Sequence, residues 1–217
     1  SYHSIISAIA GGASRINEIA TKTGMETSGC SNQTASLTAL GIVRKETPVT
    51  ENASSRKTIY RLEDSMFLFW YRFVRPNTSG IIQNAGTTIY EHIVKPNLSD
   101  FMGRVFEDIC QQYLYHPQIY TNLPFLPGNT GRWWGTDPVK KRQEEIDIMA
   151  IQDNQALLCE CKWRNVPVNI EITKQLLDRG KLFHYDQIFY FLFSKTGFTK
   201  EVLELSLIHI SEPTRLD

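Results

Sequence analysis

Apolar side chains recur at helical spacing along the first part of the chain. The pattern predicts a helix from the start of the chain, a second over residues 15–24 and a third over residues 28–41, with Gly24 and Gly41 ending the last two. Residues 42–46 and 58–62 show the short pattern of strands, and the polar stretch between them predicts a loop. Helices followed by a ribbon of strands are therefore expected for residues 1–64.

This order resembles a winged helix-turn-helix, in which the third helix enters the DNA major groove and the ribbon touches the backbone. The third helix offers Asn32 and Gln33 for such contacts but carries no arginine or lysine. The loop of the ribbon adds Arg56 and Lys57, which can hold phosphates. DNA contact through these four residues is one expectation, and docking on another protein is the alternative.

The middle of the chain predicts a helical connector over residues 65–97. The aromatic stretch MFLFWYRFV, residues 66–74, predicts a helix, and residues 76–80 are expected to end it. Residues 81–94 predict another helix, which stops before Pro96. Ser99 is expected to cap the next helix, whose apolar residues fall on one face with Glu107 near its edge. A second domain is therefore expected over residues 98–204.

Within this domain, residues 115–127 predict irregular structure or a short strand, and GNTGRWWG, residues 128–135, predicts a loop. EIDIMAIQDNQALLCECKW, residues 145–163, predicts two buried strands joined by a turn at Asp153 and Asn154. Glu160 and Lys162 fall on the same face of the second strand, about 6 to 7 Å apart along it. Charged residues lie here where a buried hairpin should be apolar, which indicates a functional site.

Residues 170–181 predict a helix with Gln175 beside its inward face, and QIFYFLFS, residues 187–194, a buried central strand. A leading helix, a hairpin, a helix and a strand predict an α/β domain with mixed strand directions, in a chain that is α+β overall.

The acidic residues of the hairpin suit a hard divalent cation such as magnesium, which prefers oxygen ligands. Asp147 and Glu160 are the expected ligands, with Glu107 as a further carboxylate. Lys162 is expected to help activate an attacking water and to stabilise negative charge on an attacked phosphate. The alternative is a buried ion pair between Lys162 and one of the two hairpin carboxylates.

Asp147, Glu160-Cys161-Lys162 and the preceding Glu107 resemble the PD-(D/E)xK nuclease superfamily, with its restriction-endonuclease-like fold. The stretches MFLFWYRFVRPN, MGRVFEDICQQYL, WWG, EIDIMA and CECKW resemble more closely the C-terminal domain of unknown function of archaeal-type AAA+ ATPases, where it follows a winged helix. The proline-aspartate of the superfamily motif is here Ile146-Asp147.

This resemblance implies a magnesium-dependent DNA endonuclease-like domain in a fragment whose upstream ATPase domain is missing. It assigns metal binding to Asp147, Glu160 and Glu107, catalysis to Lys162 and an auxiliary role to Gln175. ATP is expected only in the missing domain, since the chain has no phosphate-binding loop motif. The alternatives are a non-catalytic module that binds DNA or protein for the ATPase, and a structural lid on it.

The composition excludes several classes of protein. The 23 basic and 23 acidic residues balance, so there is no overall positive field of the kind that marks many nucleic-acid binders. The 4 cysteines form no disulfide framework, and neither a signal peptide nor a membrane span is present in the sequence, so cytoplasmic location is expected. LSLIHISEPTR, residues 205–215, resembles the translation of a sequencing-library adapter, which predicts a non-native tail over residues 205–217.

Overall fold

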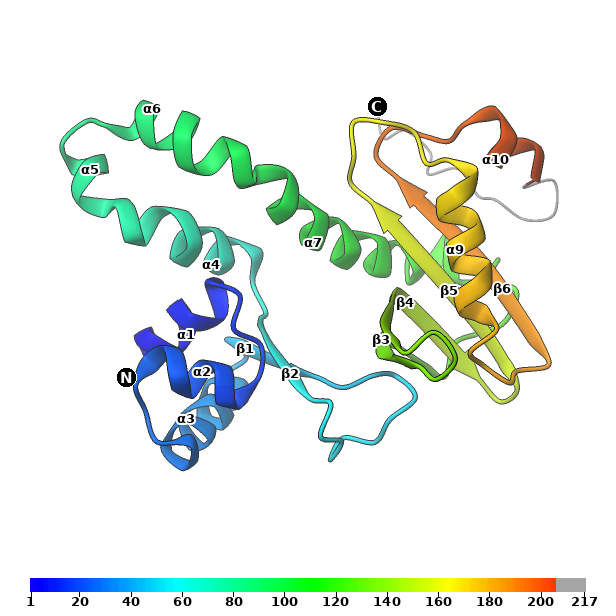
Figure 1. Cartoon of the computed structure of the whole chain (residues 1–217), viewed down its shortest axis with the longest axis horizontal. Helices are drawn as coiled ribbons and strands as arrows, with labels where there is room; N and C mark the ends of the chain where they lie inside the picture. Colours follow the sequence, from blue (N-terminus) through cyan, green and yellow to red (C-terminus); the bar gives the residue numbers. More distant parts are fainter. Residues whose placement is uncertain (206–217) are drawn as a thin grey trace. The chain divides into compact units, whose positions relative to one another are not determined.

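The computed structural model describes residues 1–205, so the predicted tail lies outside the described residues except for Leu205. The chain divides into two units (Figure 1). The first contains Ser1–Thr47 and Asn52–Phe101, and the second contains Pro48–Glu51 and the residues from Met102 onward. Residues 65–97, expected as a connector, thus belong to the first unit.

The first unit begins with the three expected helices, α1 (Tyr2–Ala10), α2 (Ile16–Thr23) and α3 (Thr27–Ala39). Gly24 ends α2 in the left-handed conformation, with φ 67°, which glycine adopts without steric cost. The expected ribbon follows as β1 (Val43–Glu46) and β2 (Ile59–Leu62), which pair antiparallel. Val43 and Leu62 pair with each other at one end of this ladder. Both are buried with the apolar faces of the three helices in one core.

The helical stretch after the ribbon corrects two predictions, because the helices continue through both prolines. The elements in order are α4 (Ser65–Phe69), η1 (Trp70–Val74), η2 (Arg75–Asn77), α5 (Thr78–Ile82), α6 (Gly86–Ile89), η3 (Tyr90–Val94) and α7 (Lys95–Leu114). Pro76 and Pro96 each lie two residues beyond a π-helical turn, η1 or η3. Such a turn widens the helix and changes its hydrogen-bond pattern, which accommodates the proline ring and its missing N–H.

The break in these helices falls at residues 83–85, where Asn84 has a φ of 62°. Ser99 is consequently an interior residue of α7 and not its N-cap. The helix expected to follow Ser99 in the second domain therefore begins earlier, at Lys95.

The second unit is built on a sheet with strand order β3-β4-β5-β6. The strands are β3 (Asn129–Asp137), β4 (Arg142–Gln152), β5 (Gln155–Lys162) and β6 (Gln187–Ser194). The first three pair antiparallel, and β6 pairs parallel with β5 after the crossover helix α9 (Ile170–Gly180). Short helices α8 (Pro117–Tyr120) and α10 (Lys200–Leu205) complete the unit. The prediction of a mixed α/β sheet is confirmed.

The prediction of a loop over residues 128–135 is wrong, because most of this stretch is β3. The glycines in this stretch obscure the strand pattern in the sequence. In the structure, the stretch pairs with β4 from Asn129 to Asp137. Trp133 contributes to the core below it, with its ring against Phe183 at a centroid distance of 4.8 Å. The apolar surface of the aromatic side chain supplies the packing that the glycines lack.

The sheet of the second unit has an apolar core on each face. On one face, Met149 and Leu158 pack with Leu176 of α9. On the other face, Ile148 and Cys159 pack with Cys110 of α7. Neighbouring residues of each strand thus belong to different cores, as the alternation of side chains along a strand requires.

Candidate functional site

A β-bulge in β4 sets the position of Asp147. Where β4 pairs with β3, Asp147 and Ile148 together lie opposite the single residue Arg132. The ladder between β4 and β5 ends at Ile148, so Asp147 lies just beyond it. Its carboxylate accepts a hydrogen bond of 2.8 Å from the backbone N–H of Cys161. Bulges of this kind redirect a side chain at the end of regular pairing, and here the bulge directs Asp147 to the end of β5.

Side chains of alternating charge form a continuous series beside Asp147, which we call the charge chain. Its members, in order of contact, are Arg142, Glu144, Arg179, Glu160, Lys162 and Asp147. They come from β4, α9 and β5. With three cations and three carboxylates, the charge chain is neutral when every member is ionised.

Arg179 and Lys162 make the central contacts of the charge chain. Arg179 donates from Nε to Glu144 Oε2 at 2.9 Å and from Nη1 to Glu160 Oε2 at 2.7 Å. Lys162 Nζ contacts Glu160 Oε1 and lies 3.6 Å from Asp147 Oδ2. Both oxygens of Glu160 are therefore engaged by cations, one from β5 and one from α9.

Burial makes these contacts electrostatically strong. Glu144, Asp147 and Glu160 are only 6%, 6% and 5% exposed, and a charge removed from water to this degree needs a partner. Burial, together with the negative charge of Asp147, raises the pKa of Glu160, although Lys162 and Arg179 oppose the shift. An additional cation near Glu160 would therefore stabilise its ionised form.

The pKa shifts of Glu144 and Lys162 favour the ionised form of each side chain. Burial opposes the charge of Glu144, but hydrogen bonds from Arg179 and Arg142 outweigh it and lower the pKa of Glu144. Burial likewise opposes the charge of Lys162, yet Asp147 and Glu160 raise the pKa of its amine. Lys162 is thus a cation held between two carboxylates.

Two of the predicted site residues are not members of the charge chain. Glu107 comes from α7, on the opposite face of the sheet, and its carboxylate lies 3.5 Å from Nε of Arg132 on β3. Gln175 was expected beside the inward face of α9, but the structure leaves it exposed. The residue of α9 that reaches the carboxylates is Arg179, one turn later.

The sequence contained signals for the residues that the prediction missed. Glu144 lies two positions before the buried Ile146, so the alternation of the strand places both on the same face. Arg179 lies three positions after the buried Leu176, at the spacing that places two residues on one side of a helix. Extending the alternation of β4 by two residues would have found Glu144.

The chemistry of these ligands fits a magnesium ion only in a limited way. Carboxylate oxygens are the ligands that magnesium prefers, and one or two carboxylates with waters and phosphates suffice for many sites. Asp147 and Glu160 provide such a pair. Among residues 1–205, no group of three or more His, Cys, Asp or Glu side chains is arranged to hold a metal ion. The residues therefore fit a site with two carboxylates, without Glu107 as a direct ligand.

The residues predicted to contact DNA all belong to the first unit. Asn32 is exposed on α3 and Gln33 is half-buried beside it. Arg56 and Lys57 are exposed in the loop between β1 and β2. Their exposure is compatible with contact to a phosphate backbone, and DNA binding stays a prediction.

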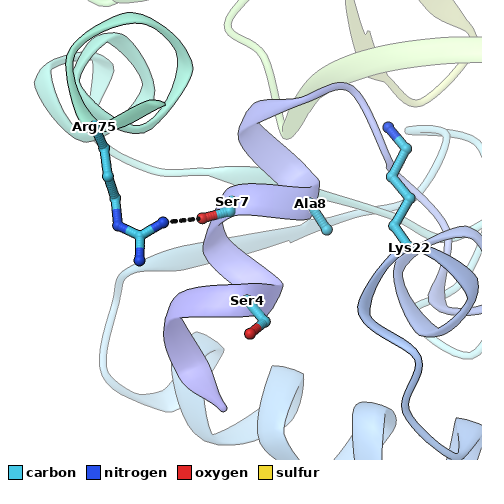
Figure 2. A pocket seen from close by; sticks show the side chains of 5 residues that line it. All are labelled: Ser4, Ser7, Ala8, Lys22 and Arg75. Atoms are coloured by element: carbon cyan, nitrogen blue, oxygen red, sulfur yellow. Dashed lines mark hydrogen bonds between the residues drawn. The ribbon is translucent and has the colours of Figure 1, made fainter. Parts of the chain in front are cut away.

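A pocket in the first unit is lined by Ser4, Ser7, Ala8, Lys22 and Arg75. Figure 2 shows Arg75 and Lys22 on either side of α1, with Arg75 Nη1 donating to Ser7 Oγ at 3.1 Å. Lys22 Nζ donates to the backbone oxygen of Gly11 at 2.8 Å. Both cations are thus used to hold α1, and the pocket brings no acid–base pair together.

Comparison with known proteins identifies a similar family and one distant relative. The DUF234 family model, described as "Archaea bacterial proteins of unknown function", matches residues 70–175. The uncharacterized protein MJECL04 of Methanocaldococcus jannaschii is 32% identical over 167 residues, which make up 76% of this chain and 36% of that relative. The chain thus spans about a third of the relative's length. No solved structure is significantly similar to the chain.

The match includes the hairpin and all the predicted residues of the metal site, while Arg179 and the ribbon of the first unit lie outside it. It confirms the resemblance to a domain of unknown function in archaea and bacteria, and the assignments to a nuclease superfamily and to an ATPase stay predictions. Among the helices that the structure describes, none is long and apolar enough to cross a membrane.

Proposed function

We propose that the second unit is a magnesium-dependent nuclease-like domain that hydrolyses phosphodiester bonds in DNA. One observation carries the proposal: two buried carboxylates from adjacent strands, Asp147 and Glu160, converge on the amine of Lys162. In this function Asp147 and Glu160 hold the divalent cation. The cation, when bound, supplies positive charge at the attacked phosphate.

Lys162 adds to that charge from the protein side. Its amine is fixed between the two carboxylates and only partly exposed, so it needs little rearrangement to stabilise negative charge that develops on a phosphate. The second unit has a mixed sheet with α7 on one face and α9 on the other, and a mixed sheet is also what the proposed restriction-endonuclease-like fold would have. The fold supports the proposal but does not by itself define an activity.

The first unit is proposed to contain a winged helix that binds DNA for this domain. Its helices and antiparallel ribbon have the order of such a module. Asn32 and Gln33 on α3 would contact base edges, and Arg56 and Lys57 in the ribbon loop would contact phosphates. Fluorescence anisotropy with a labelled duplex at low and moderate salt tests this role, and the variant Arg56→Ala/Lys57→Ala should lose affinity at low salt.

Nicking of supercoiled plasmid DNA tests the catalytic proposal directly. The purified chain should nick DNA with magnesium or manganese and not with EDTA. Asp147→Ala should abolish nicking, and Asp147→Asn should do the same while keeping an oxygen that accepts the hydrogen bond from Cys161. Asp186→Ala, at an exposed position of the same unit, is the matched control and should nick like the wild type. Equal nicking by wild type and Asp147→Asn would remove the proposal.

A non-catalytic module that binds DNA or protein is the second candidate, and the closed charge chain favours it. Each of its carboxylates already contacts a cation of the protein. Titration with magnesium or manganese in a calorimeter separates the two candidates. Binding heat that Glu160→Gln removes supports the nuclease, whereas no heat with either protein supports the module.

The proposal extends to an ATPase that would drive or gate this domain, as the sequence resemblance implies. ATP would then bind to that domain, and the chain described here would regulate or be regulated by it. Co-purification with a separately expressed ATPase domain from the same reading frame tests the association. A mixture that elutes as two separate species would contradict it.

A further inference from the structure

The guanidinium of Arg179 contacts one of the two oxygens of Glu160 that a divalent cation could use. Its Nη1 lies 2.7 Å from Glu160 Oε2, and the other oxygen, Oε1, contacts Lys162. Lys162 comes from the same strand as Glu160 and also faces Asp147, which ties it to the site. Arg179 comes from α9, a different element from the strand that holds Glu160 and Lys162.

A divalent cation and Arg179 cannot both stay on this oxygen without strong repulsion. Magnesium binds carboxylate oxygens at about 2.0–2.1 Å, so an ion on Oε2 would lie less than about 5 Å from the guanidinium nitrogen. At that separation, in a buried site, like charges repel strongly. Binding of the cation at Oε2 therefore has to include a movement of Arg179.

A second carboxylate is already in place to receive Arg179. Its Nε donates to Glu144 Oε2 at 2.9 Å, so the side chain is anchored there whether or not Nη1 contacts Glu160. Glu144 is 6% exposed and also contacts Arg142, which keeps it ionised as an acceptor. Only the bond from Nη1 to Glu160 has to break, and the guanidinium stays paired throughout.

We propose that Arg179 is a built-in counter-ion of the candidate metal site, which pairs with Glu160 in the cation-free protein and shifts fully onto Glu144 when a divalent cation binds. This inference rests on the proposed function, since it concerns the same carboxylates. It makes Arg179 a positioning residue that sets the affinity for the cation, and Glu144 its alternative partner.

Calorimetric titration of the full chain with manganese tests the proposal through two variants with opposite expected signs. Arg179→Met removes the competing cation, and the affinity for manganese should rise by about tenfold or more. Glu144→Gln removes the charge of the alternative partner, so Arg179 stays on Glu160 and the affinity should fall several-fold. A purely structural role would weaken binding in both variants.

Lys181→Met is the control for the loss of one positive charge near the end of α9. Lys181 is highly exposed and pairs with Asp178, so its replacement should change the affinity by no more than about twofold. Circular dichroism establishes that each variant is folded. If Arg179→Met does not fold, Arg179→Gln takes its place, since it also removes the charge but keeps a hydrogen-bond donor: tighter binding supports the proposal, and unchanged or weaker binding overturns it.

The outcomes also separate this inference from the proposed function. Manganese binding by the wild type that Arg179→Met leaves unchanged or weakens overturns the role of Arg179 and leaves the metal site standing. Absence of binding by the wild type and by folded Arg179→Met overturns the metal site itself, and the inference with it.

Discussion

Replacement of Arg179 by methionine should destabilise the second unit substantially. The guanidinium bridges Glu144 and Glu160, and both carboxylates are almost fully buried. Removing one partner of a buried ion pair costs about 3–5 kcal/mol, because the remaining charge stays out of water. Glu144 keeps Arg142, and Glu160 keeps Lys162, so neither carboxylate is left alone. We therefore expect the lower end of that range, about 3 kcal/mol.

Urea unfolding followed by tryptophan fluorescence measures this loss of stability in the second unit. Three of the four tryptophans, Trp133, Trp134 and Trp163, belong to the second unit. Lys181→Met is the matched control, because its side chain is 78% exposed, and it should lose less than about 1 kcal/mol. If Arg179→Met is no less stable than Lys181→Met, the bridge between Glu144 and Glu160 does not stabilise the fold, and the electrostatic argument for the charge chain fails.

Three further predictions concern stability. The lowered pKa of Glu144 means that its ionised form stabilises the fold above the ordinary value of 4.5 and that this stabilisation is lost as the pH falls through the lowered value, so the deficit of Glu144→Gln in urea unfolding should be large near pH 7 and shrink near pH 3. Leu176→Ala should lower the free energy of unfolding by about 2–5 kcal/mol and Leu177→Ala by less than about 1 kcal/mol, because the two neighbours on α9 are 1% and 37% exposed. Equal losses of stability in thermal unfolding would contradict this packing. Gly180→Ala should destabilise the protein, because the new Cβ would clash with the hydroxyl and ring of Tyr190 in β6. Gly103→Ala, which has open space around it in α7, should instead stabilise the protein by about 0.5–1 kcal/mol. Melting temperatures, followed by circular dichroism, that shift in the same direction for both variants would contradict this comparison.

Much of the fold could be predicted because its strongest patterns are local. The early helices carry apolar residues at helical spacing and end at glycines, and β6 is a nearly continuous apolar run. The hairpin was recognised from its turn at Asp153, which adopts a φ of 49°, and from the charges that interrupt its apolar pattern. These features depend on neighbours in sequence, so a single sequence contains them.

The errors arose where distant contacts decide the conformation. Pro76 and Pro96 normally end helices, but a π-helical turn before each one changes the hydrogen-bond pattern so that the helix continues. The glycines of β3 favour a loop, and only pairing with β4 makes a strand of them. The bulge at Asp147 also has no local signal, because it is defined by the residues of β3 opposite.

The site itself was half predictable for the same reason. The alternation along β5 places Glu160 and Lys162 together, and the structure brings Asp147 to them. The pairing of Glu160 with Arg179 joins residues separated by the turn into α9, and no strand period extends across it. An auxiliary residue was expected at Gln175 from the family resemblance, whereas the helix presents Arg179 to the carboxylates.

Stability alone does not explain why the charge chain is made of charged and not apolar side chains. Apolar residues of similar volume in place of a buried ion pair are often neutral or stabilising, so a series of six charged side chains has no advantage for packing. Its central carboxylate, Glu160, lies near the carboxyl end of β5, close to where β5 and β6 end together at Lys162 and Ser194. In open α/β sheets this end of parallel strands is where ligands bind. Glu160 at this position, held between Lys162 of its own strand and Arg179 of α9, is the feature on which the proposed metal site rests.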